Sequence, residues 1–422
     1  MSIYKRNEFF GAILYDTVQK EYLYCDKFTR FLIDNEFINK NDQQIDKKIL
    51  HRFDVTQEEY ECICSDLHDL IKDDDIKDVE NNVIENMLSA PLRVFLDFTY
   101  ACNLRCKHCF TCSGNKKDDE LSFEQKKCII DQMVDMGAYR ISLAGGEPLI
   151  SKEFFPFVEY ARSKGIDVSF TTNGTLITKD IIKRLNELQI RTITISLEGS
   201  NKEDNDTIRG TGSFDRVMKN LLLLSEYYEG TVALRMTMMR HNISKADEFI
   251  SLAEKMGCKK VKFNAMRMTG RAEENSDLLL SPKEYVDFVK KMELYKPEKV
   301  KVILPLNPFQ KEPYDFIEEL GFGCVAGKDC MTISPEGFVR PCSQLDFNYA
   351  DGNCKSHTLK DIWENGKYFN YYRTLEGNSQ CKRCKVYNKC RGGCRYRALQ
   401  GGDINGVDPY CYVKNMYEEV IV

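Results

Sequence analysis

Residues 100–112 read YACNLRCKHCFTC and place four cysteines within thirteen positions. The apolar run before them predicts a strand at 94–99, so the cysteines fall in the loop that follows this strand. Cys102, Cys106 and Cys109 are separated by three and then two residues. Three thiolates on one loop can bind three irons of a [4Fe-4S] cube and leave the fourth iron open to another molecule. A zinc site completed by His108 or Cys112 is the alternative interpretation.

The composition of the chain indicates where such thiols would function. Its 422 residues include 18 cysteines, 60 basic and 65 acidic side chains. The first residues, MSIYKRNEFFGAILYD, lack the features of a signal peptide, and no apolar run approaches the ~18 residues of a membrane-spanning helix. We therefore expect a cytoplasmic protein, in which cysteines are more often metal ligands or catalysts than disulfides. The nearly balanced charge indicates neither a nucleic-acid nor a membrane partner.

The N-terminal part of the chain predicts a small, separate α+β domain, which we place at 1–85. Two short apolar segments, 8–15 and 20–25, are typical of a β-hairpin, and two segments with helical spacing follow them. The stretch at 73–90 is acidic and weakly apolar. We expect it to be the linker to the next domain.

Residues 92–310 alternate between strand and helix patterns, which indicates a parallel sheet covered by helices. The predicted strands are 94–99, 139–144, 166–171, 191–197, 231–237 and 260–265. The predicted helices between them are 122–136, 152–164, 178–188, 213–229 and 244–256. Six such repeats are fewer than the eight of a closed barrel, so the fold class is α/β with a partial (β/α)6 TIM barrel. The active site is expected at the carboxyl ends of the strands, where the cysteine loop lies.

The third predicted domain, 311–422, has little apolar periodicity and many Gly, Cys and Lys residues. Apolar burial alone is not expected to hold such a segment together, and bound metal would supply the missing stability. Its cysteines include the run CKRCKVYNKCRGGC at 381–394. Because C-x2-C is also typical of zinc ligands, a pair of zinc sites is the alternative to iron–sulfur clusters.

The stretch CNLRCKHC at 102–109 resembles the signature of radical S-adenosylmethionine (SAM) enzymes, and the six predicted repeats are similar to their partial barrel. The stretch LAGGEPL at 143–149 is similar to the GGEP motif of that family, whose backbone holds the amino group of SAM. The resemblance therefore implies that Gly145, Gly146 and Glu147 bind this cofactor. Glycines suit such a contact because side chains would keep the ligand away from the backbone.

The resemblance assigns three further SAM contacts to the ends of the next strands. Asn173 would lie near the ribose and Ser196 near the methionine carboxylate, and Arg209 would pair with that carboxylate as a two-pronged donor. Two positions depart from the family pattern. Glu198 stands where an aspartate is usual, and His108 stands where an aromatic residue is common, which affects the expected contact with the adenine.

The cysteines of the third domain resemble those of the SPASM domain, an appendage of radical SAM enzymes that usually holds two auxiliary [4Fe-4S] clusters. The resemblance implies that the first auxiliary cluster binds Cys324, Cys330, Cys342 and Cys394. It implies that the second binds Cys381, Cys384, Cys390 and Cys411. A cluster with four protein ligands is suited to electron transfer rather than to substrate binding.

These resemblances imply a radical SAM oxidoreductase. The cluster at the first loop would reduce SAM, a 5′-deoxyadenosyl radical would take a hydrogen atom from substrate, and the auxiliary clusters would accept the electron left behind. The N-terminal domain looks like the winged-helix domain with which peptide-modifying enzymes bind a leader peptide as an added strand. The expected partners are therefore a precursor peptide with a leader and a reducing protein such as flavodoxin or ferredoxin. Formation of cysteine thioether cross-links is the reaction that fits best.

Several alternatives stay open at this point. The N-terminal domain could be a plain cap on the barrel, and oxidative decarboxylation or carbon–carbon bond formation could replace thioether formation. A sulfatase-maturing enzyme, which makes formylglycine, would carry an acid directly after the cysteine that matches Cys342, whereas this chain has Ser343. A non-catalytic iron–sulfur carrier or peptide-binding scaffold would not need SAM-binding motifs. The sequence identifies no catalytic base, and Cys112 is interpreted as a bystander.

Overall fold

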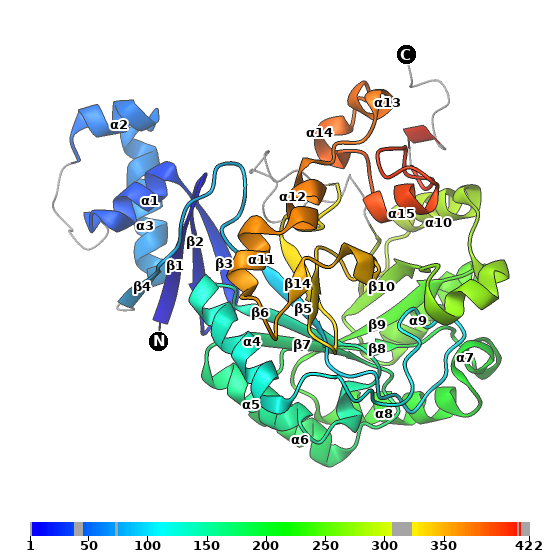
Figure 1. The fold of residues 1–422 in the computed structure, drawn as a ribbon. Helices are drawn as coiled ribbons and strands as arrows, with labels where there is room; N and C mark the ends of the chain where they lie inside the picture. The colour runs from blue at the N-terminus through cyan, green and yellow to red at the C-terminus, as the bar shows by residue number, and fades with distance from the viewer. Residues whose placement is uncertain (1, 38–44, 72–74, 306–322, 412, 415–422) are drawn as a thin grey trace.

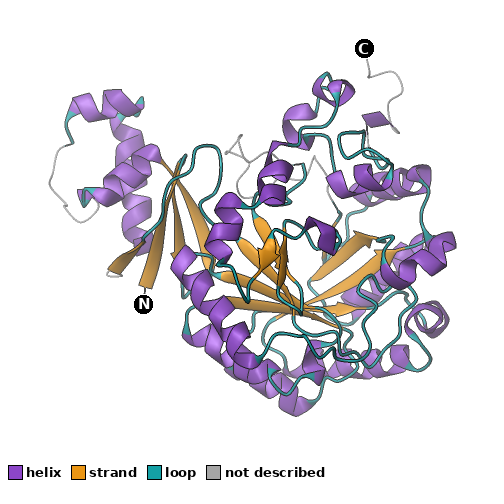
Figure 2. Cartoon of the chain, in the orientation of Figure 1, coloured by secondary structure: helices purple, strands orange, loops and turns teal. Residues whose placement is uncertain are grey.

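The computed structural model describes residues 2–37, 45–71, 75–305, 323–411 and 413–414. A small N-terminal sheet with three helices lies beside a large sheet (Figure 1). Helices cover the outer side of the large sheet, and the C-terminal segment lies over its rim (Figure 2). None of the described helices has the length and apolar character that crossing a membrane would require.

The N-terminal sheet has the strand order β3-β2-β1-β4. Its strands are β1 (Ser2–Glu8), β2 (Gly11–Asp16), β3 (Glu21–Asp26) and β4 (Asp75–Val79). Its helices are α1 (Lys27–Asp34), α2 (Lys47–Phe53) and α3 (Gln57–Ile71). The predicted hairpin is present as β2 and β3, whereas the linker prediction is wrong for β4. This mostly polar segment forms an edge strand because its backbone pairs in parallel with β1.

The N-terminal domain is packed against the large sheet. The sequence patterns predict a separate domain and give no sign of this contact. Tyr15 stacks on Tyr139 with 4.7 Å between ring centroids, and both belong to the main apolar core. The Tyr22 hydroxyl accepts a hydrogen bond from the backbone N–H of Tyr139 at 2.8 Å. Because the prediction used local patterns only, it could not detect this shared core.

The large sheet has the strand order β11-β10-β9-β8-β7-β6-β5-β12-β13-β14. Its first seven strands in the chain are parallel: β5 (Arg93–Asp97), β6 (Arg140–Ala144), β7 (Asp167–Thr172), β8 (Thr192–Ser196), β9 (Thr231–Met238), β10 (Lys260–Ala265) and β11 (Lys301–Ile303). Within the described residues the order does not return to its start, so the barrel is open. All six predicted strands are confirmed, with ends that differ by at most two residues.

The helices between these strands confirm the five that were predicted and add others. The predicted ones are α4 (Phe123–Met136), α5 (Phe154–Ser163), α6 (Lys179–Glu187), α8 (Ser213–Tyr227) and α9 (Ala246–Lys255). The additional ones are η2 (Pro148–Ile150), α7 (Lys202–Arg209), η3 (Ile243–Lys245), η4 (Gly270–Leu278) and α10 (Pro282–Leu294). Helix α4 begins at a capping box of Ser122 and Gln125 and ends at Gly137, whose φ of 72° favours glycine.

The two faces of the large sheet differ in chemistry. The outer face packs apolar residues such as Phe98 against Phe154 and Phe157 of α5. On the other face, polar side chains of adjacent strands bond to one another. The Ser142 and Ser169 hydroxyls are 2.7 Å apart, for example. A polar inner face allows the open barrel to receive a polar ligand.

The C-terminal region extends the large sheet before it becomes irregular. Its elements are β12 (Cys330–Ile333), β13 (Phe338–Arg340), η5 (Phe347–Tyr349), β14 (Gly352–Asn353), α11 (Leu359–Asn365), α12 (Lys367–Thr374), α13 (Ser379–Lys382), α14 (Tyr387–Cys390) and α15 (Arg395–Gln400). Strand β12 pairs in parallel with β5. Trp363 is fully buried in the main core and donates to the Leu88 carbonyl at 2.8 Å. Apolar burial therefore stabilises this region more than its composition suggested.

Candidate active site

The first cysteine loop lies directly after β5, at the carboxyl end of the large sheet. Its backbone is fixed at both ends, because Cys102 N–H donates to the Gly114 carbonyl at 2.8 Å. Arg271 holds the other end: its Nε donates to the Cys106 carbonyl at 2.9 Å and its backbone N–H to the Cys109 carbonyl at 3.0 Å. The loop is therefore shaped by the protein itself.

The three thiols of this loop lie near one another. Cys106 is buried, whereas Cys102 and Cys109 are half-buried. The pKa of Cys106 is raised to about 11, mainly by burial and also by the neighbouring Cys109 and Cys102 thiols, while Arg209 opposes this shift. Arg209 Nη1 lies 3.9 Å from the Cys106 sulfur. Bound iron would favour the thiolate form that this burial disfavours.

Among the described residues, no group of three or more His, Cys, Asp or Glu side chains is arranged to hold a single metal ion. Thiolates that hold a [4Fe-4S] cube each bind a different iron, so they surround the cube without converging. Two polar atoms beside the loop, His108 Nδ1 and Arg209 Nε, are buried and have no hydrogen-bond partner among the described residues. Such atoms indicate room for a bound polar group.

The two motif glycines after β6 allow this strand to pack against the cysteine loop. Gly145 has φ of 107°, and a Cβ on Gly146 would lie only 2.2 Å from the Ala101 carbonyl oxygen. Gly146 N–H donates to the Thr99 carbonyl at 2.7 Å. The glycines therefore bring the backbone of the GGEP segment beside the expected cluster, where the prediction places the amino group of SAM.

Glu147 of the same motif points into the protein. Its fully buried carboxylate accepts hydrogen bonds from Thr172 Oγ1 and from the Asn173 N–H, both at 2.7 Å. Burial raises the pKa of Glu147 to about 7, although these hydrogen bonds favour the ionised form. The Glu147 side chain therefore joins the ends of β6 and β7, and its assignment as a SAM contact stays a prediction.

Asn173 lies next to the cysteine loop, as expected for a residue near the cofactor. Its side-chain amide donates to Asn103 Oδ1 at 2.8 Å, and its Oδ1 accepts from the Thr175 N–H at 2.9 Å. The side chain is almost completely buried. Through Asn103, the end of β7 is tied directly to the segment that carries the first two cysteines.

Arg209 and Ser196 do not share a partner. Arg209 Nη2 donates to Glu198 Oε1 at 2.6 Å, and both side chains are buried. The Ser196 hydroxyl instead accepts from Arg235 Nη2 at 3.1 Å. Arg209 is therefore already paired with the Glu198 carboxylate in this structure. Its pairing with the carboxylate of SAM stays a prediction. Arg235, which the sequence analysis did not single out, is the arginine that contacts Ser196.

Glu198 is the centre of the charged group at this end of the sheet. Burial alone would raise its pKa, but the adjacent Arg209 guanidinium lowers the pKa below its ordinary value. Its second oxygen accepts from the Thr237 N–H at 2.7 Å. His108 Nε2 lies 3.3 Å from Glu198 Oε1, and burial lowers the pKa of His108 to about 4. The pair is therefore a neutral histidine beside a carboxylate at pH 7.

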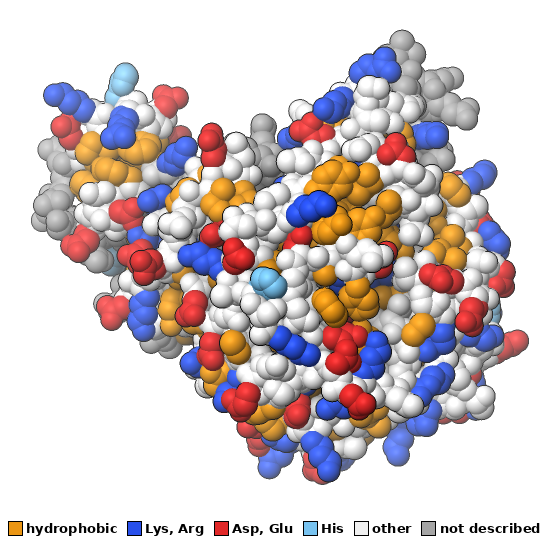
Figure 3. Space-filling model, in the orientation of Figure 1, with side chains coloured by type: hydrophobic (Ala, Val, Ile, Leu, Met, Phe, Trp, Pro, Cys, Tyr) orange, Lys and Arg blue, Asp and Glu red, His pale blue; other side chains and the backbone are white. Residues whose placement is uncertain are grey.

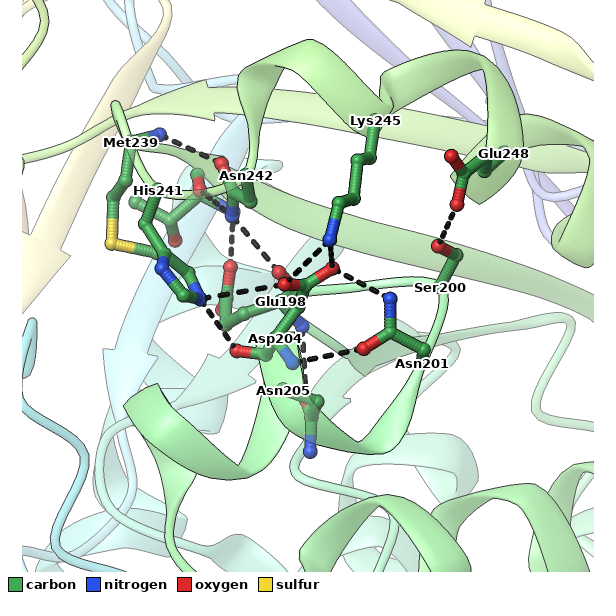
Figure 4. A network of polar contacts seen from close by, with 11 residues as sticks. Glu198, Ser200, Asn201, Asp204, Asn205, Met239, His241, Asn242, Lys245 and Glu248 are labelled. Carbon is green, nitrogen blue, oxygen red and sulfur yellow. Dashed lines mark hydrogen bonds and ion pairs between the residues drawn. The ribbon is translucent and has the colours of Figure 1, made fainter.

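The turn after β8 is held by the polar network shown in Figure 4. The Glu198 N–H donates to Asn205 Oδ1 at 3.0 Å, and Asn242 Nδ2 donates to the Glu198 carbonyl at 3.0 Å. Asp204 on α7 pairs with Lys245 of η3 at 2.8 Å. This network fixes α7, which carries Arg209, relative to β8 and β9.

Four cysteines of the C-terminal region form one neighbouring group. They are Cys324, Cys330, Cys342 and Cys394, and each interacts electrostatically with at least one other of the four. Burial raises the pKa of Cys394 to about 11, while Arg397 opposes this shift. The structure therefore brings together the four residues that the prediction assigned to the first auxiliary cluster.

A second group lies on the short helices near the end of the described chain. Cys390 interacts electrostatically with Cys411 and Cys381, and the Cys384 N–H donates to the Cys381 carbonyl at 2.9 Å. The two groups are joined by Asp408, whose carboxylate accepts from the Cys394 N–H at 2.8 Å. The division of the eight cysteines into two groups of four agrees with the predicted assignment, which stays a prediction.

Arg267 connects the two cysteine regions, and the sequence analysis missed it. Its guanidinium donates to the Ser343 carbonyl at 3.2 Å and to the Ser343 hydroxyl at 3.0 Å. It also lies 4.1 Å from the ring centroid of Phe110, the residue after Cys109. The only available signal was its position two residues after the sixth predicted strand, where active-site residues of such barrels lie.

Comparison with known proteins agrees with this geometry. Residues 96–253 match the family profile of the radical SAM superfamily, and residues 324–391 match that of SPASM, an iron-sulfur cluster-binding domain. The chain is 32% identical over 333 residues to the mycofactocin maturase MftC of Mycobacterium tuberculosis, which covers 78% of this chain and 84% of the relative. It is 28% identical over 345 residues to the AdoMet-dependent heme synthase of Methanosarcina barkeri, which covers 77% of this chain and 97% of the relative.

Among solved structures, SuiB of Streptococcus suis bound to its precursor peptide SuiA has a TM-score of 0.72. The match covers 96% of this chain and 97% of that one, at 19% identity. At this identity the likeness shows the fold alone. A match over 96% of the chain has to include most of the N-terminal domain as well as the large sheet.

Proposed function

This chain belongs to the radical SAM superfamily and carries an iron–sulfur-binding SPASM domain, and from that membership we propose that it is a peptide maturase. Its cofactors are a [4Fe-4S] cluster with SAM in the barrel and auxiliary iron–sulfur clusters in the SPASM domain. When bound, the cluster and SAM supply a carbon radical strong enough to remove a hydrogen atom from an unreactive C–H bond. The protein supplies binding, orientation and exclusion of water.

We assign the cofactor ligands from the positions of the cysteine groups and from the family matches. Cys102, Cys106 and Cys109 would hold the SAM-binding cluster, because they have the C-x3-C-x2-C spacing and lie on a loop that the protein fixes at both ends. The two C-terminal groups of cysteines would hold the auxiliary clusters. The backbone at Gly145 and Gly146, together with Asn173 and Ser196, would position SAM beside the first cluster.

The mycofactocin maturase among the relatives supports a peptide as the substrate. The N-terminal domain supports the same conclusion, since the structural match to a peptide-bound enzyme extends over it. A leader peptide would add to the edge strand β3, using main-chain hydrogen bonds. The modification would be oxidative, and a thioether cross-link from a cysteine of the peptide is the form that we propose. A flavodoxin or ferredoxin would supply the electron.

The haem synthase among the relatives points to a second candidate function, the synthesis of haem. That relative is matched over 97% of its length but covers only 77% of this chain. The mycofactocin maturase covers 78% of this chain, so coverage does not separate the two candidates. Sulfatase maturation is disfavoured by Ser343, whose hydroxyl bonds to Arg267 where that reaction requires an acid.

The test has two parts. The anaerobically reconstituted enzyme, given SAM and dithionite, is expected to form 5′-deoxyadenosine, and Cys106→Ala is expected to form none. Co-expression with a short, cysteine-containing reading frame encoded beside the gene is expected to give a peptide that is lighter by two hydrogens per cross-link. Its cysteines would also resist alkylation. An unmodified peptide together with haem production would support the second candidate, and absence of 5′-deoxyadenosine would contradict both.

A further inference from the structure

Two buried tyrosine hydroxyls lie beside the first group of auxiliary cysteines. Tyr372 on α12 is 1% exposed and Tyr396 on α15 is 5% exposed. Both belong to one small apolar cluster with Cys394, and Cys324 and Cys342 pack against this cluster. Neither hydroxyl has a hydrogen-bond partner among the described residues. Because a buried hydroxyl is normally hydrogen-bonded, a partner other than the described side chains is indicated.

The two tyrosines pack in one cluster with three of the four cysteines, although they lie apart from most of them in the sequence. Tyr372 interacts electrostatically with Cys324, Cys342 and Cys394, and Tyr396 interacts with Cys394 and Cys342. The Tyr372 ring is also held from one side by the ring of Tyr349, with 6.3 Å between centroids at 83°. Edge contacts of this kind limit reorientation of the ring, so the hydroxyl keeps its direction.

We propose that Tyr372 and Tyr396 donate hydrogen bonds to sulfur atoms of the auxiliary cluster at Cys324, Cys330, Cys342 and Cys394 and thereby raise its reduction potential. The inference rests on the ligand assignment proposed above. Hydrogen bonds to cluster sulfurs stabilise the reduced form, which carries more negative charge. This cluster then accepts the electron left on the substrate more readily. The phenols act as donors only, and no proton is transferred.

The test replaces each hydroxyl by hydrogen and measures the cluster potentials. In the anaerobically reconstituted enzyme, EPR-monitored redox titration of Tyr372→Phe and of Tyr396→Phe is expected to show one of the clusters reduced less favourably. The expected change is about tenfold in the equilibrium constant, which is about 59 mV for a one-electron couple. Iron content is expected to stay at the level of the unmodified enzyme, because the phenyl ring still fills the same space.

Tyr139 provides a matched control. It is also 1% exposed, and its hydroxyl also lacks a partner among the described residues, but its electrostatic neighbours are tyrosines and Arg6 rather than cysteines. Tyr139→Phe is therefore expected to leave all potentials unchanged. As an independent measurement, proton ENDOR of the unmodified enzyme should show couplings to one cluster that disappear after exchange into D2O. One such coupling should be absent from each of the Tyr372→Phe and Tyr396→Phe variants in H2O.

The outcomes test the role of the tyrosines and the ligand assignment separately. Unchanged potentials and unchanged proton couplings in both phenylalanine variants, at full iron content, would overturn the role of the tyrosines. An equal shift in Tyr139→Phe would overturn it as well. A Cys330→Ser variant that retained all of its iron would instead contradict the ligand assignment on which the proposal rests.

Discussion

Glu147 is expected to make the stability of the folded chain depend on pH. Burial raises its pKa from 4.5 to about 7, against hydrogen bonds from Asn173 and Thr172 that favour the carboxylate. Between these two values the folded chain keeps a proton that the unfolded chain has released. The stability contributed by this group is therefore fully present below pH 4.5 and is lost as the pH rises through 7. A residue conspicuous for its place in a cofactor motif thus also controls the stability of the strand ends.

We predict that Glu147→Gln, which stays neutral, removes this dependence. Between pH 5 and pH 8 the unmodified holoenzyme should lose up to about 3 kcal/mol more stability than the variant, since one pKa unit corresponds to about 1.4 kcal/mol. Anaerobic thermal unfolding at four pH values across this range measures the difference. Glu124→Gln on the exposed side of α4 is the control and should keep the slope of the unmodified enzyme. Equal slopes for Glu147→Gln and the unmodified enzyme would contradict the prediction.

At the scale of elements, the site depends on how closely the end of β6 approaches the cysteine loop. We predict that Gly146→Ala displaces this loop, because the added Cβ would lie 2.2 Å from the Ala101 carbonyl oxygen, and backbone there cannot move aside easily. The SAM-binding cluster should be lost while the auxiliary clusters persist, so that about a third of the bound iron disappears. Iron and sulfide analysis together with EPR of the reconstituted protein measures this loss.

Gly257→Ala is the matched control for that experiment. Gly257 also has a positive φ, 73°, but a Cβ there would meet nothing closer than 3.7 Å. The substitution should cost about 1 kcal/mol of stability and leave the iron content unchanged. Full iron content in Gly146→Ala would show that the junction between β6 and the cysteine loop tolerates more space than the structure indicates.

The elements also show what could be predicted from the sequence. All six β-α repeats were predicted, because each strand and helix carries its own apolar period. Strand β4, with the sequence DIKDV, was read as a linker because its partner β1 lies about 70 residues earlier in the chain. Helix α7 has one buried apolar residue, Ile208, and gave no periodic signal. Helix α10 was missed although Ser281, Pro282 and Glu284 form a capping box with proline at its start.

The same distinction holds for the site. The cysteines and the motif glycines could be predicted because their spacing along the chain is fixed. The pairing of Arg209 with Glu198 could not, since it results from competition among several buried charges. Arg235 and Arg267 could not be selected either, because neighbouring strands and a distant loop bring them to the site only after folding.

At the scale of the whole molecule, the N-terminal domain and the barrel form one packed unit. Besides the stacked tyrosines, Arg6 of β1 reaches the barrel, where its Nη1 donates to the Gly137 carbonyl at 2.8 Å. A buried ion pair at 2.7 Å holds Arg6 beside Glu8 of the same strand. Glu8 in turn accepts hydrogen bonds from the backbone N–H and the hydroxyl of Ser89, both at 2.9 Å. A leader peptide bound to β3 would consequently be held at a fixed position relative to the barrel (Figure 1).

The surface in Figure 3 carries acidic and basic side chains interspersed over the visible face. The two signs of charge are mixed on this face, so no single-sign field would orient a partner there. On the proposed mode of leader binding, peptide modification would require the interface between the N-terminal domain and the barrel. Loss of the interface should then affect the peptide reaction and leave the cleavage of SAM alone.

We predict that Glu8→Ala destabilises the chain by about 3–5 kcal/mol, because it leaves the Arg6 guanidinium buried without its carboxylate. Since the two domains share a core, thermal unfolding followed by fluorescence should shift as a single transition. Below the transition the domains stay packed, so formation of 5′-deoxyadenosine with dithionite should persist. Glu21→Ala, on the exposed side of β3, is the control and should change the unfolding midpoint little. Two separate transitions in the unmodified chain would show that the domains fold independently and that the leader is not held rigidly.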